Sequence, residues 1–276
     1  MNCRPLLISL FAICVPVLSA TAQDSVQYEF EFVSEWSVLT HPTDHPDDGA
    51  HYSRVIGATH TDQLSLWEPG GIATTGIEVM AETGAIAALM SEVESHITEG
   101  TADQFLSLGR LDFTPGSISS SITASSEFQF LSLVTMLAPS PDWFVGIHDI
   151  DLRPGGIWVR ELVIDLDPYD AGTDAGTTYR NPNIDITPHL PIINIANDFP
   201  FNGGGRIGTF RVTLISDAAC SLADFAEPYN LLDFFDVSAF IAAFSSQDSD
   251  ADLNNDGSFD FFDVSSFINT YSAGCP

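Results

Sequence analysis

The chain has 276 residues, of which 38 are aspartate or glutamate and only 8 are arginine, with no lysine. The formal net charge of −30 excludes nucleic acids and anionic membranes as natural partners, because both are polyanions that such a protein repels. The same balance is compatible with divalent cations, basic surfaces or a salty exterior that screens self-repulsion.

The first 22 residues predict a secretory signal peptide. Arg4 supplies a positive start, residues 5–18 form a short apolar run, and residues 20–22 are a small-residue cleavage site. A transmembrane anchor is the alternative, but the run is too short to cross a bilayer, and no later segment reaches about 18 apolar residues. We therefore expect a secreted chain without a membrane span, starting near Gln23.

Strand patterns dominate the chain after residue 25. Residues 26–32 alternate between large apolar and polar side chains, and this period of two indicates a half-buried strand. One stretch, residues 85–97, has apolar residues at helical spacing. Several strands with one main helix predict a mainly β fold, an antiparallel β-sandwich decorated by a helix. The other β-rich runs are residues 128–137, 143–147, 157–166 and 206–215.

Three aspartates flank the predicted strands. Asp142 directly precedes the strand at 143–147, whereas Asp170 and Asp174 follow the strand at 157–166 in a loop rich in glycine and threonine. If these strands are antiparallel neighbours, the carboxylates meet at one end of the sandwich, where they repel one another unless a cation neutralises them. We interpret them as metal ligands; simple capping of turns is the alternative.

The C-terminal part contains an internal repeat. Residues 232–241 recur as residues 259–268, which marks a duplicated supersecondary unit and places a domain boundary near residue 217. Two of the four cysteines leave with the signal peptide. The remaining pair, Cys220 and Cys275, predicts one disulfide, as is usual for a lone pair in an exported protein.

The second repeat carries a calcium-loop pattern. Calcium takes six to eight oxygens, and the EF-hand spacing supplies them around a sharp turn, for which Gly257 stands at position 6. Position 12 is aspartate and not the usual glutamate, so the loop must close more tightly. An acidic turn without metal is the alternative. Behind the loop, Phe261, Val264, Ile268 and Tyr271 are predicted to form one apolar helical stripe. The predicted calcium ligands are Asp252, Asn254, Asp256, Ser258, Asp260 and Asp263.

Residues 220–276 resemble the type I dockerin domain, which has two calcium-loop-helix repeats with aspartate at position 12. The first repeat retains Asp224, Asp233 and Asp236 but lacks the other expected ligands and has one residue inserted, so its calcium binding stays open. The resemblance implies a small α-helical, EF-hand-like domain that binds a cohesin-like scaffold domain; surface attachment by a divergent copy is the alternative. Cys220 and Cys275 bracket this module and would tie its ends together.

Five motifs in the larger part occur in a characteristic order: residues 32–37, 50–53, 81–84, 139–146 and 168–176. Together they resemble the spondin domain of F-spondin and mindin over about residues 26–215. This resemblance implies a β-sandwich related to C2 domains, a role in the extracellular matrix or in adhesion, and a bound calcium ion. The residues that match its calcium ligands are Asp142, Asp170 and Asp174.

Enzymatic patterns are weak in this chain. The G-x-G-x-x-G motif at residues 203–208 precedes a predicted strand and not a helix, which indicates a hairpin loop and no dinucleotide site. There is no G-x-S-x-G motif and no cysteine left as a free nucleophile. Paired carboxylates for glycoside hydrolysis stay open in so acidic a chain.

A zinc site is conceivable in one cluster, although its spacings fit no metallohydrolase motif. Its members are His41, His45, His51, His60, Asp44, Asp47 and Asp48.

We therefore expect a signal peptide (1–22), a spondin-like β-sandwich (23–216) and a dockerin-like domain with two calcium-loop-helix repeats (217–276). The expected function is that of a secreted or cell-surface, calcium-binding, non-enzymatic protein for adhesion or ligand binding, whose tail anchors it. The ligand of the sandwich is an unknown surface or matrix molecule. The alternative is a hydrolytic subunit of an extracellular polysaccharide-degrading assembly.

Overall fold

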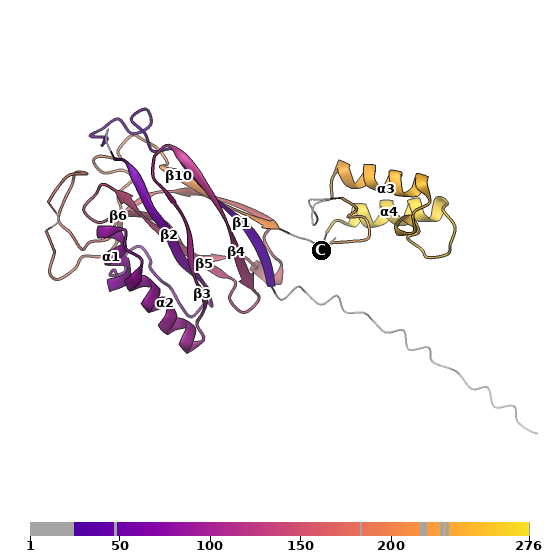
Figure 1. Cartoon of the computed structure of the whole chain (residues 1–276), viewed down its shortest axis with the longest axis horizontal. Coiled ribbons are helices and arrows are strands. Elements are labelled where there is room, and N and C mark those ends of the chain that lie inside the picture. The colour runs from indigo at the N-terminus through magenta and orange to yellow at the C-terminus, as the bar shows by residue number, and fades with distance from the viewer. Residues whose placement is uncertain are drawn as a thin grey trace, which may run out of the picture.

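The computed structural model describes residues 25–46, 49–182, 184–215, 220–226, 229 and 232–275. The predicted signal peptide and the predicted boundary near residue 217 lie outside these residues. Residues 25–215 form two antiparallel sheets with two helices, and residues 220–275 form a small helical unit (Figure 1). The prediction of a mainly β fold with two antiparallel sheets is thus confirmed. No helix in the described residues is both long and apolar enough to span a membrane.

The sheets have four and six strands, in the orders β4-β1-β10-β7 and β3-β2-β5-β6-β8-β9. Neighbouring strands are antiparallel throughout. The strands are β1 (Ser25–Ser34), β2 (His51–His60), β3 (Ala102–Leu111), β4 (Gly116–Ser125), β5 (Phe130–Ala138), β6 (Trp143–Asp151), β7 (Glu161–Leu166), β8 (Pro168–Asp170), β9 (Ile193–Asn194) and β10 (Gly208–Ile215).

The larger core fills the space between the two sheets. Tyr28, Phe30 and Phe32 of β1 are fully buried there, whereas the polar residues between them face outward. The ring of Phe30 packs edge-on against Phe210 of the neighbouring β10, with centroids 5.0 Å apart. The period of two along β1 therefore has the predicted cause, one buried and one solvated face.

A second core lies between the six-stranded sheet and the helices α1 (Thr75–Thr83) and α2 (Ala87–Glu99) (Figure 1). Ile77 of α1 and Leu89 of α2 are fully buried against it. Strand β5 has sheet on one side and helices on the other, so nearly every residue in it is buried. This double covering explains why β5 is a continuous apolar run in the sequence.

Several sequence expectations need correction. The predicted single helix at 85–97 is α2, which begins at Ala87, and α1 was missed because its nine residues are too few for a clear periodic signal. The predicted strand at 157–166 begins only at Glu161. Strand β4 was missed because half of it is serine, a poor marker of burial. The glycine motif does precede a strand, but it leads from β9 in one sheet to β10 in the other and is no hairpin.

The C-terminal unit is built from two equivalent helices, α3 (Phe234–Ser246) and α4 (Phe261–Ala273), joined through the short 3-10 helix η2 (Ser249–Ala251). Its small core includes Phe240 and Phe267, which stack with ring centroids 4.1 Å apart. The predicted apolar stripe is partly wrong. Phe261 and Ile268 are 75% and 56% exposed, because the helix turns Phe267 inward instead.

The predicted disulfide between Cys220 and Cys275 is formed, with Cα atoms 5.4 Å apart. It joins residues 55 positions apart, directly before the first loop of the C-terminal unit and directly after α4. In the chain-entropy view, closing a loop of this length stabilises the unit by about 4 kcal/mol relative to the open chain.

Candidate metal centres

Strand pairing brings the three aspartates of the sandwich together, but not in the way that the sequence suggested. The expected neighbour of β6 was β7, which lies in the other sheet. Instead, the three-residue strand β8 pairs with β6, and Trp143 lies directly opposite Asp170. Asp142 immediately precedes β6, and the chain after β8 turns back over it to Asp174. The three aspartates thus come to one end of the sandwich as expected, but through a different strand pairing.

Asp142 holds this turn closed. Its Oδ2 accepts hydrogen bonds from the backbone N–H of Thr173 at 2.8 Å and of Asp174 at 3.0 Å, and from Thr173 Oγ1 at 3.3 Å. Asp170 accepts from Gly172 N at 2.8 Å through Oδ1 and from Trp143 Nε1 at 3.2 Å through Oδ2. These bonds fix the carboxylates of Asp142 and Asp170 before any ligand binds.

Two carboxylate oxygens at this site are left without a protein partner. Asp142 is fully buried and Asp174 is 5% exposed, yet Asp142 Oδ1 and Asp174 Oδ2 accept no hydrogen bond. A buried, unsatisfied charged oxygen is expensive, and such exceptions in a native fold call for an ion or another ligand.

The electrostatics lead to the same conclusion. Burial raises the pKa of Asp142. Burial and then the charge of Asp142 raise the pKa of Asp170 to about 6, and burial followed by the charges of Asp142 and Asp185 raises the pKa of Asp174. In the described part of the chain, no arginine or histidine forms an ion pair with any of the three. Buried carboxylates that repel one another favour a hard divalent cation, but in the described residues the oxygens of these three do not all lie within 4.8 Å of one another.

A second group of side chains that could bind a metal lies nearby, and the sequence analysis missed it. Nε2 of His189 lies 3.9 Å from Glu78 Oε1 and 3.7 Å from Asp185 Oδ1. The segment that carries Asp185 and His189 is hydrogen-bonded along the Asp170–Asp174 turn, with Ile186 N donating to Thr173 O at 2.7 Å. Glu78 comes from α1, more than 100 positions earlier, and no local pattern could have linked the three.

The predicted calcium loop of the tail is folded around its own acidic side chains. Asp252 Oδ2 accepts from Gly257 N at 2.8 Å, and Asp256 Oδ1 accepts from Ser258 N at 2.8 Å. Gly257 has φ +78°, a left-handed conformation for which glycine is suited. Asp263 is fully buried, and its Oδ2 accepts from Asp260 N at 3.0 Å. The remaining predicted ligand, Asn254, accepts from Asp256 N at 2.9 Å. All six predicted residues therefore belong to one closed loop that ends on the first turn of α4.

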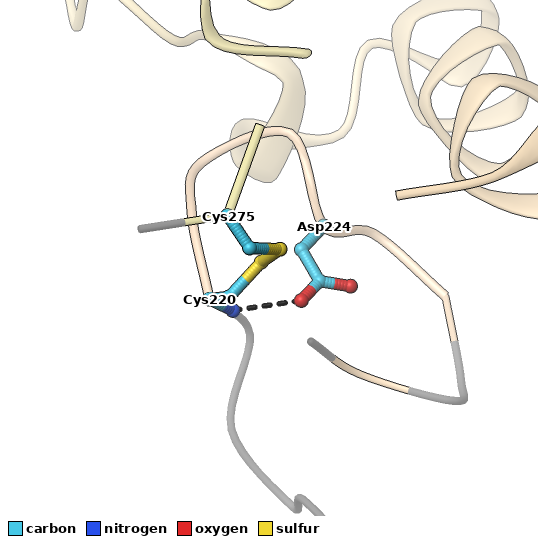
Figure 2. Close-up of side chains that lie close together, drawn as sticks. All are labelled: Cys220, Asp224 and Cys275. Atoms are coloured by element: carbon cyan, nitrogen blue, oxygen red, sulfur yellow. Dashed lines mark hydrogen bonds between the residues drawn. A yellow bond between two sulfur atoms is a disulfide. The ribbon is translucent and has the colours of Figure 1, made fainter. Parts of the chain in front are cut away.

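The first repeat uses its aspartates differently. Asp224 lies beside the disulfide and accepts a hydrogen bond from Cys220 N at 2.7 Å (Figure 2). Asp236 is fully buried and accepts from Asp233 N at 2.7 Å, completing the capping box of α3. The residues between 226 and 232 lie mostly outside the described part of the chain. The two cysteines are joined to each other, so they are no metal ligands despite their closeness to Asp224.

The four histidines considered for zinc do not form one site. His51 and His60 lie at opposite ends of the ten-residue β2. His60 is buried against Ser132 Oγ at 2.8 Å, and burial lowers its pKa. His41 Nε2 lies 3.3 Å from Gly205 O, and His45 packs against Trp36. Asp44 is described, with φ +52°, whereas Asp47 and Asp48 lie outside the described residues. Among the described residues, no three members of this cluster have ligand atoms within 4.8 Å of one another, so the structure gives the zinc hypothesis no support there.

Comparison with known proteins gives one clear family match. The Spondin_N family model matches residues 26–204. Spondin-1 of Rattus norvegicus is 34% identical over 190 residues, which is 64% of this chain and 23% of Spondin-1. Spondin-2 of Rattus norvegicus is 32% identical over 188 residues, covering 65% of this chain and 56% of Spondin-2, and human Spondin-2 is also 32% identical. The match thus spans about a quarter of Spondin-1 and just over half of Spondin-2.

Proposed function

The chain belongs to the Spondin_N family, and from that premise we propose that it is a calcium-stabilised adhesion or ligand-binding protein. Spondin homologues are secreted, non-enzymatic proteins of the extracellular matrix, so the chain is a secreted protein and no enzyme. The alternative of a hydrolytic subunit loses its support for the same reason. Calcium, the ligand and the role of the tail are the parts of this function that we propose.

One observation supports calcium most directly: the unsatisfied oxygens of Asp142 and Asp174 in a buried cluster of carboxylates. Calcium supplies the charge that neutralises such a cluster and accepts flexible oxygen coordination. In our proposal Asp142, Asp170 and Asp174 hold it at the loop end beside β6. An ion that binds only the folded chain stabilises it by about 2.7 kcal/mol at a hundredfold excess over Kd.

We propose that the tail is a separate calcium-dependent anchor. The closed loop from Asp252 to Asp263, repeated helices and the disulfide support a dockerin-like unit. Its first loop binds no second ion in this proposal, because Ala226 and Pro228 stand where oxygen ligands are expected. A cohesin-like scaffold domain is the partner that such a unit would take.

A capture experiment tests this division of labour. The full chain is immobilised and exposed to surface extract from the producing organism, with calcium or with chelator. We expect calcium-dependent capture in which Asp170→Asn removes one set of partners and Asp256→Ala another. Capture that is unchanged by chelator and by both variants would refute the calcium-dependent function.

A further inference from the structure

A pocket of about 330 Å³ lies where the start of β2, the end of β3 and the turn between α1 and α2 meet. We propose that it binds one singly charged oxyanion group, a carboxylate or a sulfate ester, carried by a small organic ligand. Nothing in the calcium sites is involved, because the lining residues come from other segments. This is a second binding function, independent of the one proposed above.

The pocket gathers scarce positive charge. Arg54 and Arg110 both line it, and they lie directly opposite each other in the register of β2 and β3. Like charges at opposed positions destabilise a sheet. Arginine is scarce here, with 8 residues in a chain whose net charge is −30. Two arginines that face each other repel, and an anion between them would relieve this repulsion. Asp112 supplies part of the negative charge through a 2.6 Å contact with Arg110 Nε.

Arg54 remains the uncompensated cation. In the described part of the chain its guanidinium forms no ion pair, and the one hydrogen bond that it donates goes from Nη1 to the backbone oxygen of Leu108 at 2.5 Å. The strand register shifts on both sides of Arg54, between Tyr52 and Arg54 and between Arg54 and Ile56. Such irregularities re-aim side chains and are common next to binding sites. The planar guanidinium has further N–H groups with which to hold a carboxylate or sulfate.

The start of α2 adds to the same field. Its N-cap is Ile86, which offers no side-chain cap, and the first turn has no acidic residue. The other long helices have side-chain caps, α1 from Thr74 and α4 from Asp260. Ala85 and Ile86 line the pocket, so an uncapped helix N-terminus borders it. Free N–H groups and the helix dipole at such an end favour an anion.

The size and the remaining walls define the ligand. Met136 and Ile86 supply apolar surface, and Ser53 and His51 supply polar edges. A volume of this size suits a ligand of about the dimensions of one sugar ring. Because the protein as a whole repels polyanions, a ligand with a single charge is favoured over a highly sulfated polymer.

The test is a titration of the full, calcium-saturated chain, labelled with nitrogen-15, followed through the arginine Nε–H signals. The probes are glucuronate, methyl sulfate and neutral methyl glucoside. We expect Arg54 and Arg110 to shift with at least one anion and not with the glucoside, whereas Arg206 and Arg211 stay unchanged. A shift with glucuronate alone assigns a carboxylate ligand, and a shift with methyl sulfate alone assigns a sulfate ester.

Variants make the assignment specific. Arg54→Gln should weaken binding of the effective anion by about tenfold or more, since a charge-assisted hydrogen bond is lost. Arg110→Gln should weaken it as well and serves if the first variant does not fold. Arg211→Gln is the matched control, because Arg211 lies in the other sheet and pairs with Glu161. The proposal is overturned if no anion shifts Arg54, if the neutral glucoside binds equally, or if the pocket variants and the control bind alike.

Discussion

Trp143 donates its indole N–H to Asp170 Oδ2 at 3.2 Å, and the pairing of β6 with β8 sets these two residues directly opposite each other. A cation held by Asp170 withdraws electron density from that hydrogen bond, so the indole reports on the site. We predict that calcium changes the fluorescence of Trp143.

Removing the reporter separates its signal from binding itself. In Trp143→Phe the calcium-dependent fluorescence change should vanish, whereas in Trp158→Phe it should persist. Trp158 packs against Tyr28 and Arg153, away from the site. An undiminished signal in Trp143→Phe would show that the ion binds elsewhere.

The second prediction concerns Asp170→Asn, which removes one charge and keeps the shape. Without calcium a buried repulsive charge is gone, but the amide can accept only one of the two hydrogen bonds from Gly172 N and Trp143 Nε1. The first effect should be the larger and leave the variant more stable than the parent by up to about 1 kcal/mol. With calcium it should lose most of the parent's stabilisation, about 2–3 kcal/mol. Thermal unfolding with calcium and with chelator measures both effects.

Asp165→Asn is the matched control for that variant. Asp165 is largely exposed and pairs with Arg206 at 2.8 Å, outside the cluster. Its replacement should leave the response to calcium intact. If Asp170→Asn destabilised the chelated protein, simple structural damage would explain its effect and the site would lose its support.

The third prediction is a pH dependence with a definite sign. Burial raises the pKa of Asp170 to about 6 in the folded chain, above its ordinary value of 3.8. The folded state then binds more protons than the unfolded state between these values. The stability that comes from this extra proton on Asp170 is present below about pH 4 and is lost as the pH rises through about 6.

Calcium reverses that trend, since it binds the ionised carboxylates. We therefore expect chelated protein to lose stability between about pH 4 and pH 6, and the increase in melting temperature on adding calcium to grow over the same interval. Unfolding curves across this range check the prediction. If calcium raised the melting temperature equally at pH 4 and at pH 6, the binding of the ion would not be coupled to the loss of the proton.

The sequence singled out three aspartates that fold close to one turn, but it suggested the wrong strand pairing for them. Residues 168–170 are too few to show a strand pattern, so β8 was invisible and β7 was taken as the neighbour of β6. The period of two in β1 was clear because that strand has one buried face. Glu78 and His189 are joined only by tertiary folding, which no local spacing encodes. The position of Arg54 opposite Arg110 is set by the register of β2 and β3, and this register also depends on long-range contacts.

The fourth prediction concerns the disulfide. Replacing Cys220 and Cys275 together by serine should destabilise the C-terminal unit by up to about 4 kcal/mol, because its open chain gains conformational entropy. The sandwich, which has its own cores, should unfold as before. Hydrogen exchange of α3 and α4 compared with β1 and β5 measures both. Equal loss of protection in the two parts would show that the disulfide supports the whole chain.

The last prediction tests the tail loop by itself. In the Asp170→Asn background, the calcium that still binds should belong to the loop from Asp252 to Asp263. Adding Asp256→Ala removes the ligand at position 5 and the bond from Ser258 N, so both the coordination and the turn are weakened. We expect calorimetry to show one bound calcium in the background and at least tenfold weaker binding after Asp256→Ala, the cost of losing one charged ligand.

Asp250→Ala is the matched control, because Asp250 is exposed and precedes the loop. Equal binding in all three proteins would mean that the loop is an acidic turn stabilised by its own hydrogen bonds, and the calcium-dependent anchor would have to be abandoned.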